Sequence, residues 1–372
     1  MTYYPLDVVL CHGCGLSQLG YVVSPEVLYQ QDYPYESSTT AAGREHWAAF
    51  AESVSKAFGL GPTDLAVDVG SNVGVLLAGF KRMGLRIRGV DPAANIAAIA
   101  EQNGIPTLAR FFSPDVARQI VREEGQASVI TGTNVFAHID DLRQFVEAVD
   151  LLMTKEGVLV IEVPYFANLL RDLEYDTIYH EHLSYLSVRP LVAFFGRFSM
   201  DVFDIRQVDI HGGSMRVFID RAGRRPIAPA VKELIQREEE QGCHDVKRLQ
   251  RFAADVARNR DALRKLIYGL KGDGARLALV SAPAKGMTLI NYCHFGTDVF
   301  DFATEKSSLK IGRSTPGGQI PVVPDAELMN QRPDYALLLA WNFATEIMKN
   351  LSSYTQSGGR FILPIPVPRV VA

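Results

Sequence analysis

Apolar and polar positions along the chain alternate in a way that predicts strands followed by helices. An amphipathic pattern predicts a helix over 46–60, which Gly61 and Pro62 end. Short apolar runs, each followed by a helical pattern, lie at 65–69, 87–90, 127–131 and 157–163. Two further β runs within 198–219, around His211-Gly212-Gly213, are expected to close the same sheet. Strands alternating with helices predict an α/β fold with a parallel, doubly wound sheet.

The second half of the chain repeats this pattern after a long helical stretch at 226–270. From Gly274 onward, strands are predicted at 277–280, 298–302, 335–341 and 360–364, with a helix at 284–293. The sequence therefore predicts two Rossmann-like units. The expected organisation is an N-terminal segment at 1–45, a first domain at 46–222, a helical linker at 223–273 and a C-terminal domain at 274–372.

Composition narrows the class of protein. The chain has 372 residues, which suggests two domains, and 47% of them are hydrophobic, which is ample for packed cores. A net charge of −4 excludes a dedicated nucleic-acid binder, which needs a basic excess. The sequence contains no apolar run of about 18 residues, so no membrane span is expected. The N-terminus has no signal-peptide pattern. We expect a cytoplasmic protein with neither nucleic acid nor membrane as a partner.

The first chemical motif is the turn after the run at 65–69. Asp68, Gly70, Asn72 and Gly74 give the pattern D-x-G-x-x-x-G, in which small residues let a ligand approach the backbone. Asp91 ends the next strand, where a carboxylate can hold ribose hydroxyls. A dinucleotide or S-adenosylmethionine fits this arrangement, and the acid inside the strand favours the second. A turn of structural value alone is the alternative.

The second motif is the polar cluster Tyr179-His180-Glu181-His182, which follows the strand ending near 162. Two histidines at i and i+2 cannot share a helix face, so this is not the metalloprotease pattern. The cluster offers a histidine base, a carboxylate to orient it and a phenol for an oxyanion. His138 follows another strand at the same edge. The alternatives are a surface polar loop for the cluster and a structural role for His138.

Eight segments in order resemble one family. They are CHGCGLSQL at 11–19, DYPYESS at 32–38, VDVGSNVG at 67–74, TNVFAHIDDL at 133–142, YDTIYHEHLSYLS at 175–187, HGGSMRV at 211–217, APAKGMTLINYC at 282–293 and AWNFATEI at 340–347. The chain is similar to the class I S-adenosylmethionine-dependent C-methyltransferases that act on nucleotide-linked keto-deoxysugars. The resemblance covers nearly the whole chain.

The resemblance implies a role for each candidate. His182 would remove the proton α to the sugar ketone, with Glu181 supporting it. Tyr179 and Tyr33 would border the enolate, and His138 would line the pocket. The cofactor, S-adenosylmethionine, would contact the residues of the first motif together with Asn134. The C-terminal unit would hold the nucleotide diphosphate, with Lys285 near phosphate and Asn291, Trp341 and Asn342 as further candidates.

Two departures from the family pattern matter. The family opens with a zinc module of two cysteine pairs, but here only Cys11 and Cys14 are present, and zinc normally takes four ligands. Cys243 and Cys293 lie elsewhere in the sequence, so the metal site is expected to be incomplete. Either the module is truncated and metal-free, or an N-terminal segment precedes this start. In addition, Val73 stands where the family commonly has Asp.

Three other functions remain as alternatives. A nicotinamide-dependent sugar oxidoreductase is disfavoured because neither G-x-G-x-x-G nor Tyr-x-x-x-Lys is evident. A sugar O-methyltransferase would use the same cofactor and differ only in the acceptor atom. A non-catalytic nucleotide-sugar-binding protein would fit Val73 and the single cysteine pair, but not the cluster at 179–182.

Overall fold

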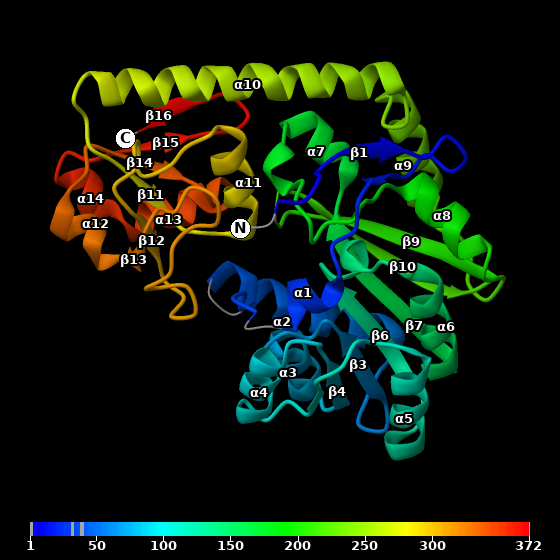
Figure 1. The fold of residues 1–372 in the computed structure, drawn as a ribbon. Helices are drawn as coiled ribbons and strands as arrows, with labels where there is room; N and C mark the ends of the chain where they lie inside the picture. The colour runs from blue at the N-terminus through cyan, green and yellow to red at the C-terminus, as the bar shows by residue number, and fades with distance from the viewer. Residues whose placement is uncertain (1–2, 31–32, 38–40, 211, 372) are drawn as a thin grey trace. The chain divides into compact units, whose positions relative to one another are not determined.

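The chain divides into two compact units. The computed structural model describes residues 3–30, 33–37, 41–210 and 212–371. The N-terminal unit comprises residues 7–166 and 180–244. The C-terminal unit comprises the described residues of 1–6, 167–179 and 245–372. Each unit contains one mostly parallel sheet (Figure 1).

The sheet of the N-terminal unit has the strand order β5-β4-β3-β6-β7-β10-β9. Its strands are β3 (Leu65–Val69), β4 (Arg86–Val90), β5 (Thr107–Leu108), β6 (Ala127–Thr133), β7 (Met153–Pro164), β9 (Met200–Val208) and β10 (Ser214–Arg221). The first five pair in parallel, and β10 runs antiparallel to both β7 and β9. Strand order reverses at β3, so a ligand crevice is expected at the carboxyl ends of β3 and β6. The predicted doubly wound sheet is confirmed.

Helices bury the faces of this sheet, which explains why its central strands are almost continuously apolar. The helices are α2 (Ala41–Phe58), α3 (Val75–Arg82), α4 (Ala94–Gln102), α5 (Pro114–Glu124), α6 (Leu142–Leu152), α8 (Val188–Gly196) and α9 (Pro229–Glu240). Packing joins α2 to α3 and α5 to α6. Gly79 allows the first of these contacts, because a Cβ there would lie 2.7 Å from Ala51 Cβ. Phe50, Phe80 and Phe218 form part of the resulting core.

A small antiparallel sheet and two short helices complete the N-terminal unit. The sheet contains β1 (Val8–Leu10), β2 (Ser17–Leu19) and β8 (Ser184–Tyr185), and the helices are α1 (Pro25–Tyr29) and η1 (Phe136–His138). The chain thereby ties its N-terminal segment to the strand that follows the cluster at 179–182.

The C-terminal unit has the strand order β13-β12-β11-β14-β15-β16. The strands are β11 (Leu277–Val280), β12 (Ala303–Glu305), β13 (Val322–Pro324), β14 (Tyr335–Leu338), β15 (Arg360–Leu363) and β16 (Arg369–Val371). The α-helices of this unit are α10 (Val246–Gly272), α11 (Ala284–Tyr292), α12 (Ala326–Gln331), α13 (Ala344–Asn350) and α14 (Ser352–Gln356). Two short 3₁₀ helices, η2 (Tyr175–Thr177) and η3 (Trp341–Phe343), belong to it as well. Helix α7 (Phe166–Asp172) begins at the boundary between the units. All strands except β16 are parallel, and order reverses between β11 and β14. The second Rossmann-like unit is confirmed.

Three sequence predictions differ from this fold. The run at 298–302 is not a strand, because β12 begins at Ala303; its Val299 and Phe300 are buried side chains of a turn. The helical stretch at 226–270 is two helices, since Gly242 adopts φ +67° and Asp245 caps the second. The expected linker is therefore divided between the two units, and residues 167–179, expected in the first domain, belong to the C-terminal unit. The two β runs around the predicted turn are present, and His211 itself lies outside the described residues.

Among the described residues, no helix is both long and apolar enough to span a bilayer.

Candidate active site

The turn after β3 depends on glycines in the left-handed conformation and is hydrogen-bonded to the residue that follows the next strand. Gly70 and Gly74 adopt positive φ, and a Cβ on Gly74 would lie 2.7 Å from the Ile105 side chain. The Asp91 carboxylate accepts hydrogen bonds from the backbone N–H groups of Asn72 and Ala93, each at 2.9 Å. Burial raises the pKa of Asp91, and these two bonds oppose that rise. The carboxylate therefore fixes the loop, and its predicted contact with the cofactor ribose stays a prediction.

Asp68 is enclosed in the sheet. It is 1% exposed, and its carboxylate accepts from Thr131 Oγ1 at 2.6 Å. Burial, aided by the charge of Asp91, raises the pKa of Asp68 to about 7. Val73, where the family commonly has Asp, is 3% exposed. The predicted cofactor contact of Asp68 stays a prediction.

Two polar atoms near the loop are buried without a hydrogen-bond partner among the described residues. They are Ser71 Oγ and Asn134 Oδ1. Asn134 follows β6 with φ +55°, and its N–H donates to Glu162 O at 2.7 Å. Buried polar atoms normally have partners, and those that lack them often face a ligand. These residues fit S-adenosylmethionine, whose ribose and amino-acid groups supply such partners.

Residues 33–37 are bonded to this loop and to α4. Asn72 donates through Nδ2 to Tyr35 O at 3.1 Å and accepts at Oδ1 from Ser37 N–H at 2.9 Å. Asn95 donates to Tyr33 O at 3.0 Å and accepts from Tyr33 N–H at 3.3 Å. The N-terminal segment thus brings Tyr33 to the cofactor loop.

Four of the predicted catalytic residues meet in the N-terminal unit. Tyr33 Oη donates to Glu181 Oε2 at 2.8 Å. The rings of His138 and His182 stack with centroids 5.0 Å apart and 29° between their planes. The bond from Leu183 N–H to Ala137 O, at 2.8 Å, joins the two backbone segments.

The cluster extends to Tyr29, which the sequence analysis did not select. Its ring stacks on His138 with centroids 6.1 Å apart, and its Oη is buried with no hydrogen-bond partner in the described part of the chain. Burial and the proximity of His182 hold the pKa of His138 well below its usual range, so this imidazole is neutral. Burial and Glu181 raise the pKa of Tyr29. The unusual number of tyrosines before residue 36 was the available signal.

A second buried network supports the same edge. Glu162, fully buried near the end of β7, accepts from Arg216 at 2.8 Å and contacts His46 Nε2 at 2.5 Å. The Arg216 guanidinium lies 3.8 Å from the Phe50 ring centroid. Charged residues inside otherwise apolar strands were the sequence signal for this pair.

The remaining candidates lie in the C-terminal unit. Tyr179 is the last residue of the segment 167–179 in that unit, so its role beside His182 stays a prediction. Lys285 Nζ lies 3.7 Å from Asp176 Oδ2, which also accepts from Trp341 Nε1 at 2.7 Å. The structure thus gives Lys285 and Trp341 a shared carboxylate partner.

Asn291 and Asn342 are placed differently. Asn291 Nδ2 donates to Met287 O at 2.8 Å and to Pro316 O at 3.1 Å, so it holds a turn. Asn342 Oδ1 is buried and has no hydrogen-bond partner within the described ranges. Substrate contacts by either residue stay predictions.

The cysteine pair offers zinc half of the ligands it normally takes. Cys11 and Cys14 are free thiols, and hydrogen bonds from residues of this turn, chiefly the Cys14 backbone, lower the pKa of Cys11. Cys243 and Cys293 are buried. Within the described ranges, no three His, Cys, Asp or Glu side chains gather as metal ligands.

Comparison with known proteins identifies the family. Residues 45–200 match a family described as a methyltransferase domain, and residues 209–366 match a C-methyltransferase C-terminal domain. The C-methyltransferase NovU of Streptomyces niveus is 37% identical over 372 residues, which is 100% of this chain and 88% of that protein. A ubiquinone biosynthesis O-methyltransferase of Methylobacterium is 35% identical over 95 residues, or 23% of this chain and 37% of that protein.

Solved structures are more distant. The magnesium protoporphyrin IX methyltransferase of Synechocystis, with bound S-adenosylmethionine, is 13% identical with a TM-score of 0.36. The match covers 49% of this chain and 82% of that one, a likeness too low to bear on function. The full-length match to NovU, with both family matches, shows that the chain belongs to the S-adenosylmethionine-dependent C-methyltransferases.

Proposed function

We propose that this enzyme methylates a ring carbon next to the ketone of a nucleotide-linked keto-deoxysugar, with His182 as general base. The observation that carries the proposal is the cluster of Tyr33, Glu181, His138 and His182 in the N-terminal unit. Asn72 and Asn95 bond its tyrosine segment to the cofactor loop. A base and hydrogen-bond donors beside a methyl donor are what carbon methylation requires.

The residues divide the work of forming a carbanion. His182 takes the α-proton, and the stacked His138 stays neutral, so only one imidazole of the pair becomes charged. Tyr33 stabilises the enolate oxygen by donating a hydrogen bond. Its single hydrogen is accepted by Glu181 in this structure, so the substrate oxygen must take the place of that carboxylate. S-adenosylmethionine, when bound, supplies an electrophilic methyl group.

The nucleotide-sugar part of the proposal is supported by the resemblance of the motifs and by the second parallel sheet. Ligands of such sheets bind where strand order reverses. In the C-terminal unit this position lies between β11 and β14. The segments that follow these strands carry the candidates Lys285, Trp341 and Asn342.

The test is product analysis with labelled cofactor. The enzyme is incubated with S-adenosylmethionine carrying a ¹³C-methyl group and with a nucleotide-linked 4-keto-6-deoxysugar. We expect the label on a ring carbon adjacent to the ketone, located by NMR and mass spectrometry. Label on a sugar oxygen would favour an O-methyltransferase instead, and absence of transfer to any keto-sugar tested would contradict the proposed substrate class.

A further inference from the structure

A buried ion pair in the C-terminal unit lies on the segment that leads to the candidate base. Asp176, in η2, is fully buried, and Oδ2 accepts from Trp341 Nε1 at 2.7 Å. Lys285 Nζ lies 3.7 Å from the same oxygen and 4.1 Å from the Trp341 ring centroid. One carboxylate oxygen therefore joins α11 and η3 to η2.

Two more hydrogen bonds fasten the same segment, and two others anchor one of its partners. Tyr175 Oη donates to Asn259 Oδ1 at 2.9 Å, and Asn259 in turn donates to Pro364 O and Pro366 O at 3.0 and 2.8 Å. Thr288 Oγ1 donates to Ile178 O at 3.1 Å. Residues 175–178 are thus held by α10, α11 and η3, although they belong to the sequence motif of the catalytic cluster.

The Lys285 amine has two acidic neighbours, Asp176 and Glu174. Burial raises the pKa of the neighbouring Glu174 to about 8, so this carboxyl is protonated at neutral pH. Lys285 then faces Asp176 as its main partner, with side-chain exposures of 15% and 0%. Burial raises the pKa of Asp176 and lowers the pKa of Lys285, and the attraction between the two groups opposes both shifts. A buried pair loses much more when one partner is removed than when both are replaced. This arrangement suits the fixing of a segment better than the binding of a diphosphate, which needs excess positive charge.

We propose that Lys285, Asp176 and Trp341 are positioning residues that fix the backbone from which Tyr179 and His182 emerge. Tyr179 ends the fastened segment, and His180 continues directly into the N-terminal unit. The inference rests on the proposed function, because the fastened segment matters for catalysis only if His182 is the general base. It gives Lys285 a role that differs from the phosphate contact predicted from the sequence.

The test is a double-mutant cycle on the full-length enzyme. Lys285→Met and Asp176→Asn should each lower kcat by about 10- to 100-fold, because a reacting group is displaced. The KM of the keto-sugar and the Kd of S-adenosylmethionine should each change by less than about threefold. The double variant should be no slower than the slower single variant, since its site holds no unpaired charge. If either single variant folds poorly, Trp341→Phe serves instead: it keeps an aromatic side chain, removes the N–H donor to Asp176, and should lower kcat by less than about 10-fold.

Controls separate this inference from its alternatives. Lys271→Met removes a lysine whose partner, Asp301, lies 3.9 Å away on the same unit, and should leave kcat unchanged. If Lys285→Met raises the sugar-nucleotide KM equally with and without Asp176→Asn, Lys285 is a phosphate ligand and the inference is overturned. The kinetics are measured with whichever acceptor the wild-type enzyme methylates. A negative result then contradicts the positioning role without depending on whether the proposed substrate class is right.

Discussion

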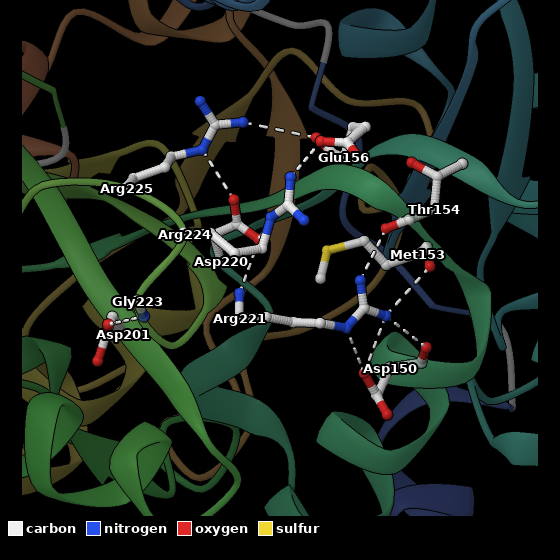
Figure 2. A network of polar contacts seen from close by, with 10 residues as sticks. All are labelled: Asp150, Met153, Thr154, Glu156, Asp201, Asp220, Arg221, Gly223, Arg224 and Arg225. Carbon is white, nitrogen blue, oxygen red and sulfur yellow. Dashed lines mark hydrogen bonds and ion pairs between the residues drawn. The ribbon is translucent and has the colours of Figure 1, made fainter.

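Two aspartates of the N-terminal sheet have the same exposure, 1%, and opposite surroundings. Asp68, near the carboxyl end of β3, has a hydroxyl donor in Thr131 and the charge of Asp91 nearby. Asp220, at the far end of β10, contacts Arg225 Nε at 2.8 Å and Arg224 Nε at 3.5 Å (Figure 2). The first carboxyl is pushed toward its neutral form, whereas the second is held by cations.

The difference extends to the two edges of the sheet. Around Asp220, Arg221 donates to the backbone carbonyls of Asp150, Met153 and Thr154, which covers the carboxyl end of α6 (Figure 2). The other edge carries four buried polar atoms that have no hydrogen-bond partner among the residues that the structure describes: Ser71 Oγ, Asn134 Oδ1, His138 Nε2 and Tyr29 Oη. Unsatisfied buried groups cost stability. At one edge the charged groups are paired, and at the other, where we expect ligands, buried donors and acceptors are left over.

The largest effect is expected at the ligand edge, from His182→Asn. The variant keeps size and polarity but cannot accept the α-proton, and loss of a general base costs about 10²- to 10⁴-fold in rate. Exchange of the substrate α-proton with D₂O, measured by NMR with S-adenosylhomocysteine in place of the methyl donor, should also cease. His180→Asn is the matched control and should exchange normally. Rapid exchange in His182→Asn would assign the base to another group, His138 or Tyr33.

Next in size is the response of cofactor affinity to Asp91→Asn. The N–H groups of Asn72 and Ala93 bond to different oxygens of Asp91, so Asn removes the charge and keeps one of the two bonds, whereas Ala would release both. A hydrogen bond to a charged group contributes about 1.5–3 kcal/mol, so the Kd of S-adenosylmethionine should rise by roughly 10- to 150-fold. Titration calorimetry measures it.

The matched control for Asp91 is Asp245→Asn. That carboxylate also accepts two backbone N–H bonds, from Lys247 and Arg248, at the start of α10. Its replacement should leave the Kd unchanged. An Asp91→Asn enzyme with wild-type affinity would show that this carboxylate only shapes the loop.

At the opposite edge, Asp220→Asn should lower stability and spare activity. Removing the buried carboxylate leaves Arg224 and Arg225 without this shared partner. Because both arginine side chains are about a quarter to a third exposed, the free energy of unfolding should fall by about 1–3 kcal/mol, less than for a fully buried pair. Urea unfolding followed by circular dichroism measures it. Asp150→Asn, in the same network but 59% exposed, should lose less than about 1 kcal/mol. A drop in kcat at unchanged stability would contradict the division between the edges.

The sequence predicted those features that depend on neighbouring residues. β3 is a short run of apolar residues broken by Asp68 alone and ended by Gly70, and Asp91 directly follows the next predicted strand. The run at 298–302 misled for the same reason, because apolar side chains buried in a turn give the same local pattern as a strand.

The features that were missed depend on residues distant in sequence. Glu162 and Arg216 are partners only because β7 and β10 pair in one particular register. Asp176 meets Lys285 and Trp341 because the segment 167–179 belongs to the C-terminal unit, which no periodicity indicates. Tyr29 reaches His138 through the docking of the N-terminal segment on Asn72 and Asn95.

The smallest predicted effect concerns the proton on Asp68. The folded protein raises the pKa of this carboxyl from 3.8 to about 7, so it holds the proton more tightly than the unfolded chain does. The resulting stabilisation is complete below about pH 3.8 and is lost as the pH rises through about 7. Asp68→Asn resembles the protonated form and can still accept from Thr131. Its thermal midpoint should therefore change less than that of the wild type between pH 5 and pH 8, to be measured by calorimetric scans.

Cofactor binding sharpens this last prediction. S-adenosylmethionine is a cation at its sulfonium and amino groups, and a nearby cation favours an ionised carboxylate. Binding at pH 7 should then release up to about half a proton from Asp68, which is about half protonated at that pH. Calorimetric titrations in buffers of different ionisation enthalpy measure the proton release. Asp68→Asn should abolish it, and the control Asp115→Asn, at an exposed carboxylate, should retain it. Equal release by the Asp68→Asn enzyme and the wild type would mean that the cofactor does not sense this carboxyl, and that Asp68, like Asp220, serves the sheet alone.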